Sequence, residues 1–203
     1  MRPLIRPEFK GNRPRRYGDY LQPLLTDFGR YCSYCERLEK LDVEHVVPKS
    51  IAPELELEWS NLLLGCLRCN RDFKKNHNHS RDGYIWPDQH NTFAMLHYDA
   101  TGRVRTASDL TPEEQRCAQA TITLLKLDDS DQPQIVLNQH RRTTFRIAQK
   151  QKQDYQNGYT SVDEICDLAS LGYWSVWMTA FAEFPEVVTA LILMSQYPNT
   201  RID

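Results

Sequence analysis

The sequence predicts an α+β protein, in which a smaller unit with strand-like segments and a structural zinc site precedes a mainly α-helical C-terminal region. Two Cys-x-x-Cys pairs stand on either side of a glutamate followed by a histidine. Helix-start signals recur after residue 110, whereas strand-like segments precede it. We therefore divide the chain into a basic arm (1–19), a site-bearing unit (20–108) and a helical region (109–203).

The composition is that of a folded protein without membrane segments. Of the 203 residues, 40% are hydrophobic and 26% are charged, which is close to the average for soluble domains. No stretch approaches the roughly 20 apolar residues of a membrane helix, so we expect no membrane association. The basic N-terminal segment lacks the apolar stretch of a signal peptide, which favours a cytoplasmic location. Because thiols stay reduced there, the six cysteines are expected to be metal ligands or buried side chains.

Charge is unevenly distributed along the chain, although the formal net charge is only −2. Residues 1–30 hold seven basic and three acidic side chains, whereas residues 161–203 hold one basic and six acidic side chains. Contacts with phosphates supply most of the affinity of nucleic-acid-binding proteins. We therefore expect the basic end to face a phosphate backbone and the acidic end to contact a protein.

Few regular elements are expected in the first half of the chain. The first 18 residues, rich in Pro, Arg and Gly, are expected to form an extended arm. Residues 20–28 predict a short helix that ends at Gly29. The segments 92–98 and 103–106 flank a turn-rich link, which predicts a β-hairpin.

Helices are expected to dominate the second half. The predicted segments are residues 111–126, 133–153, 161–171 and, in two parts split near a proline, 171–194. Thr111 and Ser161 are each followed three residues later by a glutamate, a pattern typical of capping boxes. The segment 133–153 carries a basic face that is either solvated or in contact with phosphate. The apolar character of 171–194 indicates buried helices.

Four cysteines form the clearest motif. They are two pairs of identical spacing, Cys32/Cys35 and Cys66/Cys69, and four thiolates suit tetrahedral Zn²⁺. The gap between the pairs is longer than in simple zinc ribbons, so it must contain structure of its own. The alternative is four buried thiols without a metal, but packing alone does not explain two pairs of the same spacing.

A second motif lies between and around the cysteine pairs. It consists of VEHVVPKS, which contains Glu44 and His45, and WSNLLLGCLRCN, which contains Asn61 and Asn70. Together these strings resemble the ββα-metal active site of HNH endonucleases. The flanking strings YCSYCERL and NLLLGCLRCNRDFKKN are similar to the PtuB family, the nuclease subunits of Septu anti-phage systems, which also occur with some retrons. The similarity covers about residues 20–105.

This resemblance implies a role for each motif residue. His45 would be the general base that takes a proton from the attacking water, and Asn61 would position its imidazole through a hydrogen bond. Glu44 and Asn70 would be ligands of one catalytic divalent ion. Asparagine at position 70 replaces the last histidine of the family name, as it does in the HNH domain of RNA-guided CRISPR nucleases. Because these two ligands offer only oxygen, Mg²⁺ or Mn²⁺ is expected there.

The proposed chemistry needs these residue types. Imidazole titrates near neutral pH, as a general base must, and a hard cation offsets the charge that builds on the phosphate. Candidate substrate contacts follow the motif closely: Lys74, Lys75 and His77. Solvated side chains are the plainer interpretation of these three residues. The roles of three further residues stay open: His79, Asp88 and His90.

We therefore expect an HNH endonuclease with a structural zinc that cuts nucleic acid, with DNA favoured. One alternative is a non-catalytic, zinc-stabilised module that binds nucleic acid or protein, although such a module has no reason to retain the polar motif residues. Another is an RNase with a tRNA-type target on the same fold. Because nothing resembles a sequence-reading helix, a partner is expected to choose the substrate. The PtuB resemblance implies an ABC-type ATPase as the partner in an oligomeric assembly. The acidic and apolar character of the C-terminal helices makes them the expected docking surface.

Overall fold

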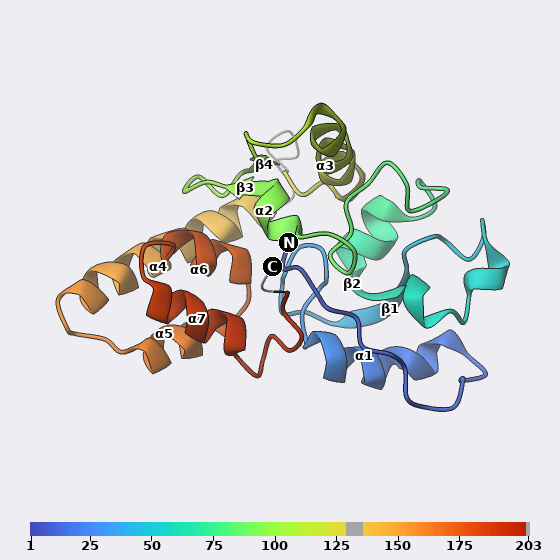
Figure 1. The fold of residues 1–203 in the computed structure, drawn as a ribbon, viewed down its shortest axis with the longest axis horizontal. Helices are drawn as coiled ribbons and strands as arrows, with labels where there is room; N and C mark the ends of the chain where they lie inside the picture. Colours follow the sequence, from blue (N-terminus) through green and yellow to red (C-terminus); the bar gives the residue numbers. More distant parts are fainter. Residues whose placement is uncertain (129–135, 202–203) are drawn as a thin grey trace.

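The computed structural model describes residues 1–128 and 136–201, which form two groups of elements (Figure 1). One group holds a pair of strands with short helices, and the other holds the helices from residue 137 onward. A second pair of strands and the helix of residues 112–125 lie at the top of the view. The two chain ends meet between the groups, where Leu4 pairs with Thr200 in an isolated β-bridge. The Arg201 amide also donates to the Pro3 carbonyl at 3.0 Å. Segments from both ends of the sequence therefore share one core.

The predicted strand-strand-helix unit is present. Strands β1 (Leu41–His45) and β2 (Leu62–Cys66) are antiparallel, with His45 opposite Leu62 and Leu41 opposite Cys66. The chain then enters η4 (Arg68–Lys74), a short helix with the wider winding of a π-helix. Two single turns, η2 (Pro53–Leu55) and η3 (Trp59–Asn61), lie in the connection between the strands. Side chains of η4 reach both ends of β1, because Lys74 donates to the His45 carbonyl and Arg71 pairs with Asp42, each at 2.8 Å.

The first predicted helix is confirmed. A single turn, η1 (Tyr17–Tyr20), leads into α1 (Leu21–Phe28), which buries Leu24 and Phe28. The helix ends at Gly29, whose φ of 80° lies in the left-handed region that favours glycine.

The N-terminal arm is only partly as expected. It has no helix before η1, but its first residues are packed into the protein. The Arg2 guanidinium donates to the Phe28 carbonyl at 2.5 Å, and Arg6 forms an ion pair with Asp88 at 2.8 Å. These two arginines therefore stabilise the folded protein and do not face a phosphate backbone. The expectation that the basic end contacts phosphates was wrong for this part of the arm.

The predicted hairpin is present but shorter than expected. Strands β3 (Leu96–Tyr98) and β4 (Val104–Thr106) pair in an antiparallel manner. The segment before β3 is a helical turn, α2 (Thr92–Met95), because the Asn91 side chain accepts a hydrogen bond from the Ala94 amide and caps it. The prediction of a strand over this turn was wrong.

The helices of the second half are α3 (Pro112–Leu125), α4 (Leu137–Gln156), α5 (Val162–Ala169), α6 (Trp174–Ala180) and α7 (Pro185–Leu193). Both predicted capping boxes are formed, at Thr111 with Glu114 and at Ser161 with Glu164. The predicted start of α4 at residues 133–135 lies outside the described residues. The apolar run 171–194 forms two helices as predicted, and α6 is almost completely buried.

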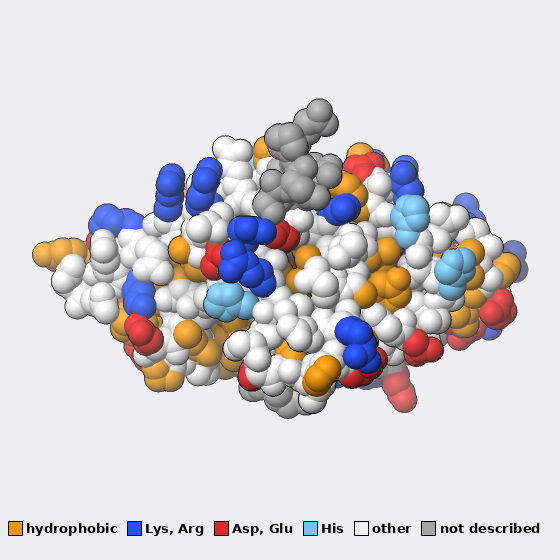
Figure 2. Space-filling model, turned by 90° about the horizontal axis from the view of Figure 1, so that it is seen from above, with side chains coloured by type: hydrophobic (Ala, Val, Ile, Leu, Met, Phe, Trp, Pro, Cys, Tyr) orange, Lys and Arg blue, Asp and Glu red, His pale blue; other side chains and the backbone are white. Residues whose placement is uncertain are grey.

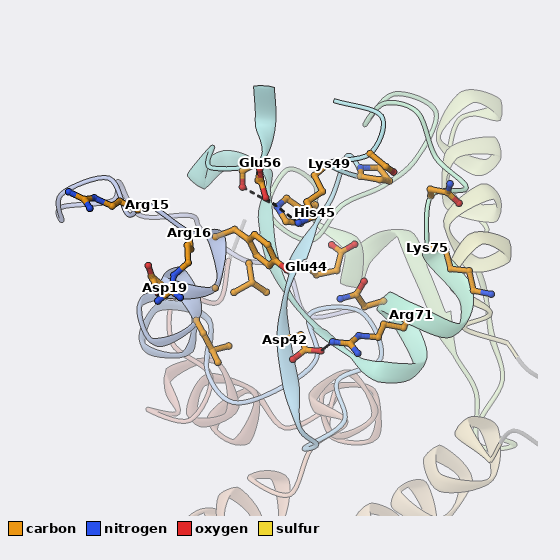
Figure 3. Close-up of a pocket in the computed structure, with 18 residues that line it drawn as sticks. Arg15, Arg16, Asp19, Asp42, Glu44, His45, Lys49, Glu56, Arg71 and Lys75 are labelled. Atoms are coloured by element: carbon orange, nitrogen blue, oxygen red, sulfur yellow. Dashed lines mark hydrogen bonds and ion pairs between the residues drawn. The ribbon is translucent and has the colours of Figure 1, made fainter. Parts of the chain in front are cut away.

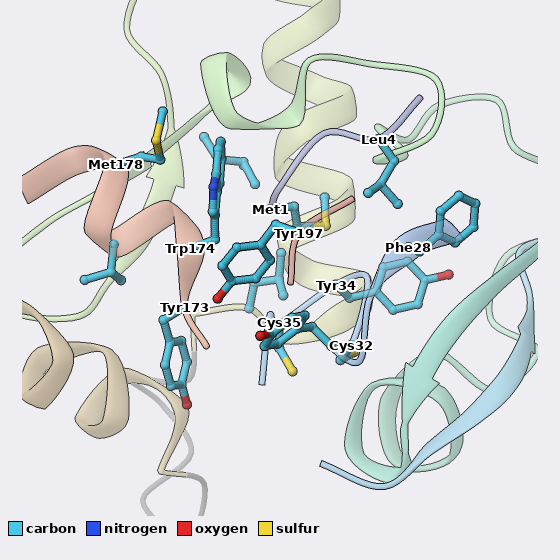
Figure 4. Close-up of a cluster of buried hydrophobic side chains, with 14 of the residues drawn as sticks. Met1, Leu4, Phe28, Cys32, Tyr34, Cys35, Tyr173, Trp174, Met178 and Tyr197 are labelled. Carbon is cyan, nitrogen blue, oxygen red and sulfur yellow. The ribbon is translucent and has the colours of Figure 1, made fainter. Parts of the chain in front are cut away.

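The C-terminal helices pack against the turn that carries the first cysteine pair. Figure 4 shows Trp174, Met178 and Tyr197 in one apolar cluster with Cys32 and Cys35. Hydrogen bonds join the same two segments. Glu36 follows this turn, and its buried carboxylate accepts hydrogen bonds from the Ser175 amide and hydroxyl at 3.1 and 2.5 Å. The helical region is therefore joined to the site-bearing unit by a shared core.

The surface is mixed in character. On the face seen in Figure 2, basic side chains are spread among acidic and uncharged ones. Within residues 1–128 and 136–201, no helix has the length and apolar character needed to cross a membrane.

Candidate active site

A cleft of about 850 Å³ opens over the end of β1, beside η4 (Figure 3). Glu44 and His45 from β1 and Asn70 from η4 line it, so the structure brings three of the four predicted motif residues together. The opposite wall comes from the N-terminal arm and η1, through Arg15, Arg16, Tyr17 and Asp19. Other lining residues include Asp42, Lys49, Glu56, Arg71 and Lys75.

His45 is held in one tautomer. Its Nε2 lies 3.0 Å from the backbone carbonyl oxygen of Glu56. A carbonyl oxygen only accepts hydrogen bonds, so Nε2 carries the proton and Nδ1 keeps the lone pair. Burial lowers the pKa of His45 and outweighs the hydrogen bond to Glu56, which acts in the opposite direction. The imidazole is therefore neutral at neutral pH and able to accept a proton at Nδ1.

Glu44 is buried and has two partners. The Lys74 ammonium lies 2.7 Å from its Oε1, and the Tyr34 hydroxyl donates to its Oε2 at 2.6 Å. Lys74 is itself fully buried and also donates to the His45 carbonyl at 2.8 Å. The prediction that Lys74 contacts substrate was wrong, because its buried ammonium binds the Glu44 carboxylate and the His45 carbonyl.

Three side chains hold consecutive carbonyls at the end of β1. Lys74 donates to the carbonyl of His45, Asn78 Nδ2 to that of Val46, and Asn61 Nδ2 to that of Val47, at 2.8, 2.8 and 2.9 Å. Asn61 Oδ1 also accepts from the Val47 amide at 2.8 Å. The predicted hydrogen bond from Asn61 to the imidazole is replaced by the one to the Glu56 carbonyl. Asn61 thus acts on the backbone that follows His45.

Glu44 and Asn70 approach each other across Gly65. A Cβ atom at Gly65 would lie 2.9 Å from Glu44 Cγ and 3.0 Å from Asn70 Cβ. The missing side chain therefore makes room for both. Their oxygen donors suit Mg²⁺ or Mn²⁺, which prefer oxygen ligands and keep several waters. Each oxygen of Glu44 retains a further lone pair beside its present partner, so the pair fits a hard divalent ion.

The four predicted zinc ligands form one buried cluster. The sulfur atoms of Cys32, Cys35, Cys66 and Cys69 all lie within 4.8 Å of one another, and Cys35 Sγ is 3.7 Å from Cys66 Sγ. Four sulfurs at about 2.3 Å from a central Zn²⁺ would be about 3.8 Å apart, so the cluster fits this ion. None of the four is in a disulfide. Burial raises the pKa of the Cys32 thiol, so metal binding there must release protons.

The sequence model of the HNH endonuclease family matches residues 32–78, which include both cysteine pairs and all the motif residues. The chain carries an HNH domain. Around it, the chain is similar to the Septu protein PtuB of Bacillus thuringiensis, with 36% identity over 88 residues. The match covers 39% of this chain and 34% of that relative, so it spans about one third of the relative's length.

The remaining predicted residues lie around the HNH domain in different environments. Lys75 is exposed and lines the cleft. His77 is exposed on a different face, beside Tyr84 and Lys126, which corrects its placement at the substrate site.

Two residues whose roles were open have structural contacts. Asp88 accepts from Arg6 and Arg81 at 2.8 and 2.9 Å. His90 Nδ1 accepts from the Trp86 amide at 3.0 Å. Both therefore hold the segment that follows the HNH domain, outside the cleft.

Sequence reasoning missed several residues that shape the candidate active site. Tyr34, inside the first cysteine pair, contacts Glu44, and Asn78 contacts the backbone after His45. The Tyr17 ring packs edge-on against the His45 ring, with centroids 4.8 Å apart. The place of Tyr34 between two metal ligands was a usable signal for the first of these contacts, whereas the others depend on chain segments that only folding brings together.

Proposed function

We propose that this protein is a metal-dependent nuclease that hydrolyses phosphodiester bonds, with DNA as the favoured substrate. The observation that supports this most directly is the tautomer of His45, whose Nε2 is held by the Glu56 carbonyl while Nδ1 is left to accept a proton. Glu44 and Asn70 line the same cleft. A binding module stabilised by zinc alone would need no such combination of groups.

The residues divide the work between proton transfer and charge stabilisation. His45 accepts a proton from the attacking water at Nδ1, and Tyr17 and the three backbone contacts keep the imidazole in place. Glu44 and Asn70 would hold Mg²⁺ or Mn²⁺, and such an ion would offset the negative charge that develops on the phosphate. Because Lys74 already balances the charge of Glu44, we expect the ion to bind weakly in the absence of substrate.

The test is cleavage of plasmid DNA and total RNA by the purified chain in Mg²⁺, Mn²⁺ or chelator. His45→Ala is expected to lower the cleavage rate by about 10²–10⁴-fold, as loss of a general base does, while the circular dichroism spectrum stays unchanged. His97→Ala is the control, since His97 is an exposed histidine on β3, outside the cleft. Plasmid cleavage by His45→Ala at the original rate would contradict the proposal. Cleavage of RNA alone would favour the RNase alternative.

We also propose that the chain acts in anti-phage defence together with an ABC-type ATPase, as its similarity to a Septu protein suggests. The C-terminal region is the candidate docking surface, because Leu171 and Leu193 are 66% and 70% exposed and residues 161–203 hold more acidic than basic side chains. Co-purification with an ABC-type ATPase from the same organism would support this assembly. Full and regulated cleavage by the isolated chain would count against it.

A further inference from the structure

The cations that line the cleft differ in whether they have acidic partners. Three of them are paired: Arg16 with Asp19 at 3.5 Å, Lys49 with Glu56 at 3.1 Å and Arg71 with Asp42 at 2.8 Å. Within the described residues, Arg15 and Lys75 also line the cleft and have no acidic side chain within 4.0 Å. Their charges are therefore available to an anionic ligand.

Arg15 and Lys75 lie on opposite sides of the cleft. Figure 3 shows Arg15 on the N-terminal arm and Lys75 at the end of η4, with Glu44 and His45 between them. Both side chains are exposed. An extended polyanion lying across the general base would meet one cation on each side.

The backbone of Lys75 gives a second, independent observation. Its φ of 46° and ψ of −120° belong to a region that glycine adopts freely and that an L side chain rarely does. The conformation is imposed by the end of η4, where the Lys75 amide donates to the Asn70 carbonyl at 2.9 Å. A lysine at a position that favours glycine costs stability, and such costs concentrate at functional sites.

We propose that Arg15 and Lys75 bind backbone phosphates on the two sides of the bond to be cut, so that duplex DNA lies across the cleft from the N-terminal arm to the end of η4. This inference rests on the proposed nuclease function and names how the substrate is held. Arg15 can offer a phosphate two parallel N–H donors, and Lys75 offers a compact charge. Neither side chain would contact base edges, so the two contacts would orient the strand without selecting a sequence.

The experiment measures binding without cleavage. All variants carry His45→Ala, and their affinity for a fluorescent 20-base-pair duplex is followed by anisotropy over a range of KCl concentrations, in buffer without divalent ions. Each phosphate contact contributes about −0.9 to the slope of log K against log salt for duplex DNA. Arg15→Ala and Lys75→Ala should each make the slope shallower by about 0.9, and the double variant by about 1.8.

The matched control is Arg142→Ala, which removes an equally exposed arginine from α4, outside the cleft. Its slope should equal that of the parent. Equal losses in the control and cleft variants would show binding by dispersed charge and overturn the inference. Unchanged slopes in the cleft variants, or no binding of the duplex by the parent, would also overturn it. The cleavage assay with His45→Ala tests the proposed nuclease function separately, because it measures cleavage and not binding.

A glycine variant separates substrate binding from folding. Lys75→Gly removes the charge and also relieves the backbone, so its melting temperature should be at least that of the parent while its salt slope becomes shallower by about 0.9. Lys75→Ala keeps the backbone conflict and should show the same slope change without the gain in melting temperature. A Lys75→Gly variant that melts lower and keeps the parent slope would assign Lys75 to folding and overturn the inference.

Discussion

Replacing Lys74 with methionine would test the buried ion pair beneath the cleft. Lys74 is fully buried and Glu44 is 2% exposed, with Nζ and Oε1 2.7 Å apart. Methionine has a similar shape but cannot donate, so a buried carboxylate loses its cation and the His45 carbonyl loses a donor. Removing one partner of a buried ion pair costs about 3–5 kcal/mol. We expect the free energy of unfolding to fall by this amount, which is a large part of the stability of most domains.

The assay is urea denaturation followed by tryptophan fluorescence, arranged as a double-mutant cycle. The four proteins are the parent, Lys74→Met, Glu44→Gln and the variant with both changes. Because the double variant has no unpaired buried charge, it should be more stable than Lys74→Met alone. Lys75→Met is the control, since the neighbouring lysine is exposed. A loss below about 1 kcal/mol for Lys74→Met, or strict additivity in the cycle, would refute the reasoning.

Three further predictions concern packing, zinc and pH. Gly65→Ala places a Cβ 2.9 Å from a side-chain carbon of Glu44, so denaturation should show a loss of about 1–3 kcal/mol, whereas Gly18→Ala, with open space around it, should be nearly neutral. Cys35→Ser should abolish the retention of zinc, as measured by metal analysis. It should also lower the stability greatly, because structural zinc contributes on the order of 10 kcal/mol in small zinc domains. Cys117→Ser is the control and should change neither the zinc content nor the stability. Burial acts to raise the pKa of Asp88, but two arginines outweigh it and hold that pKa below its ordinary value. The stability from this carboxylate is therefore complete above about pH 4 and is lost as pH falls through the lowered pKa, so Asp88→Asn should flatten the decline of the urea midpoint below pH 4.

The parts of the site that were predictable are those in which function restricts the residue type. Zinc needs four soft ligands, so two cysteine pairs of equal spacing predicted the cysteine cluster that the structure forms. A general base that works near neutral pH must in most cases be histidine, which singled out His45. Helix starts were predictable for a similar reason, since the capping boxes at Thr111 and Ser161 use short-range contacts.

The partners of these residues were not predictable in the same way. The group that orients His45 is the backbone carbonyl of Glu56, and a carbonyl is present in every residue, so no sequence pattern marks it. Lys74 and Lys75 are adjacent and chemically identical, yet one is fully buried and the other exposed. η4 ends at Lys74, and the positive φ of Lys75 turns the chain away from the helix, so only the folded backbone distinguishes the two lysines.

By itself the sequence determined which four cysteines cluster, the motif that contains His45, and the order of short strands and capped helices. Only the tertiary structure decided which polar groups line the cleft, that Arg2 and Arg6 serve the core, and that Glu44 is paired with Lys74. The reason is that ligand type and local caps are properties of a few neighbouring residues. Burial and hydrogen-bond partners arise where distant segments of the chain meet, as residues 4 and 200 do.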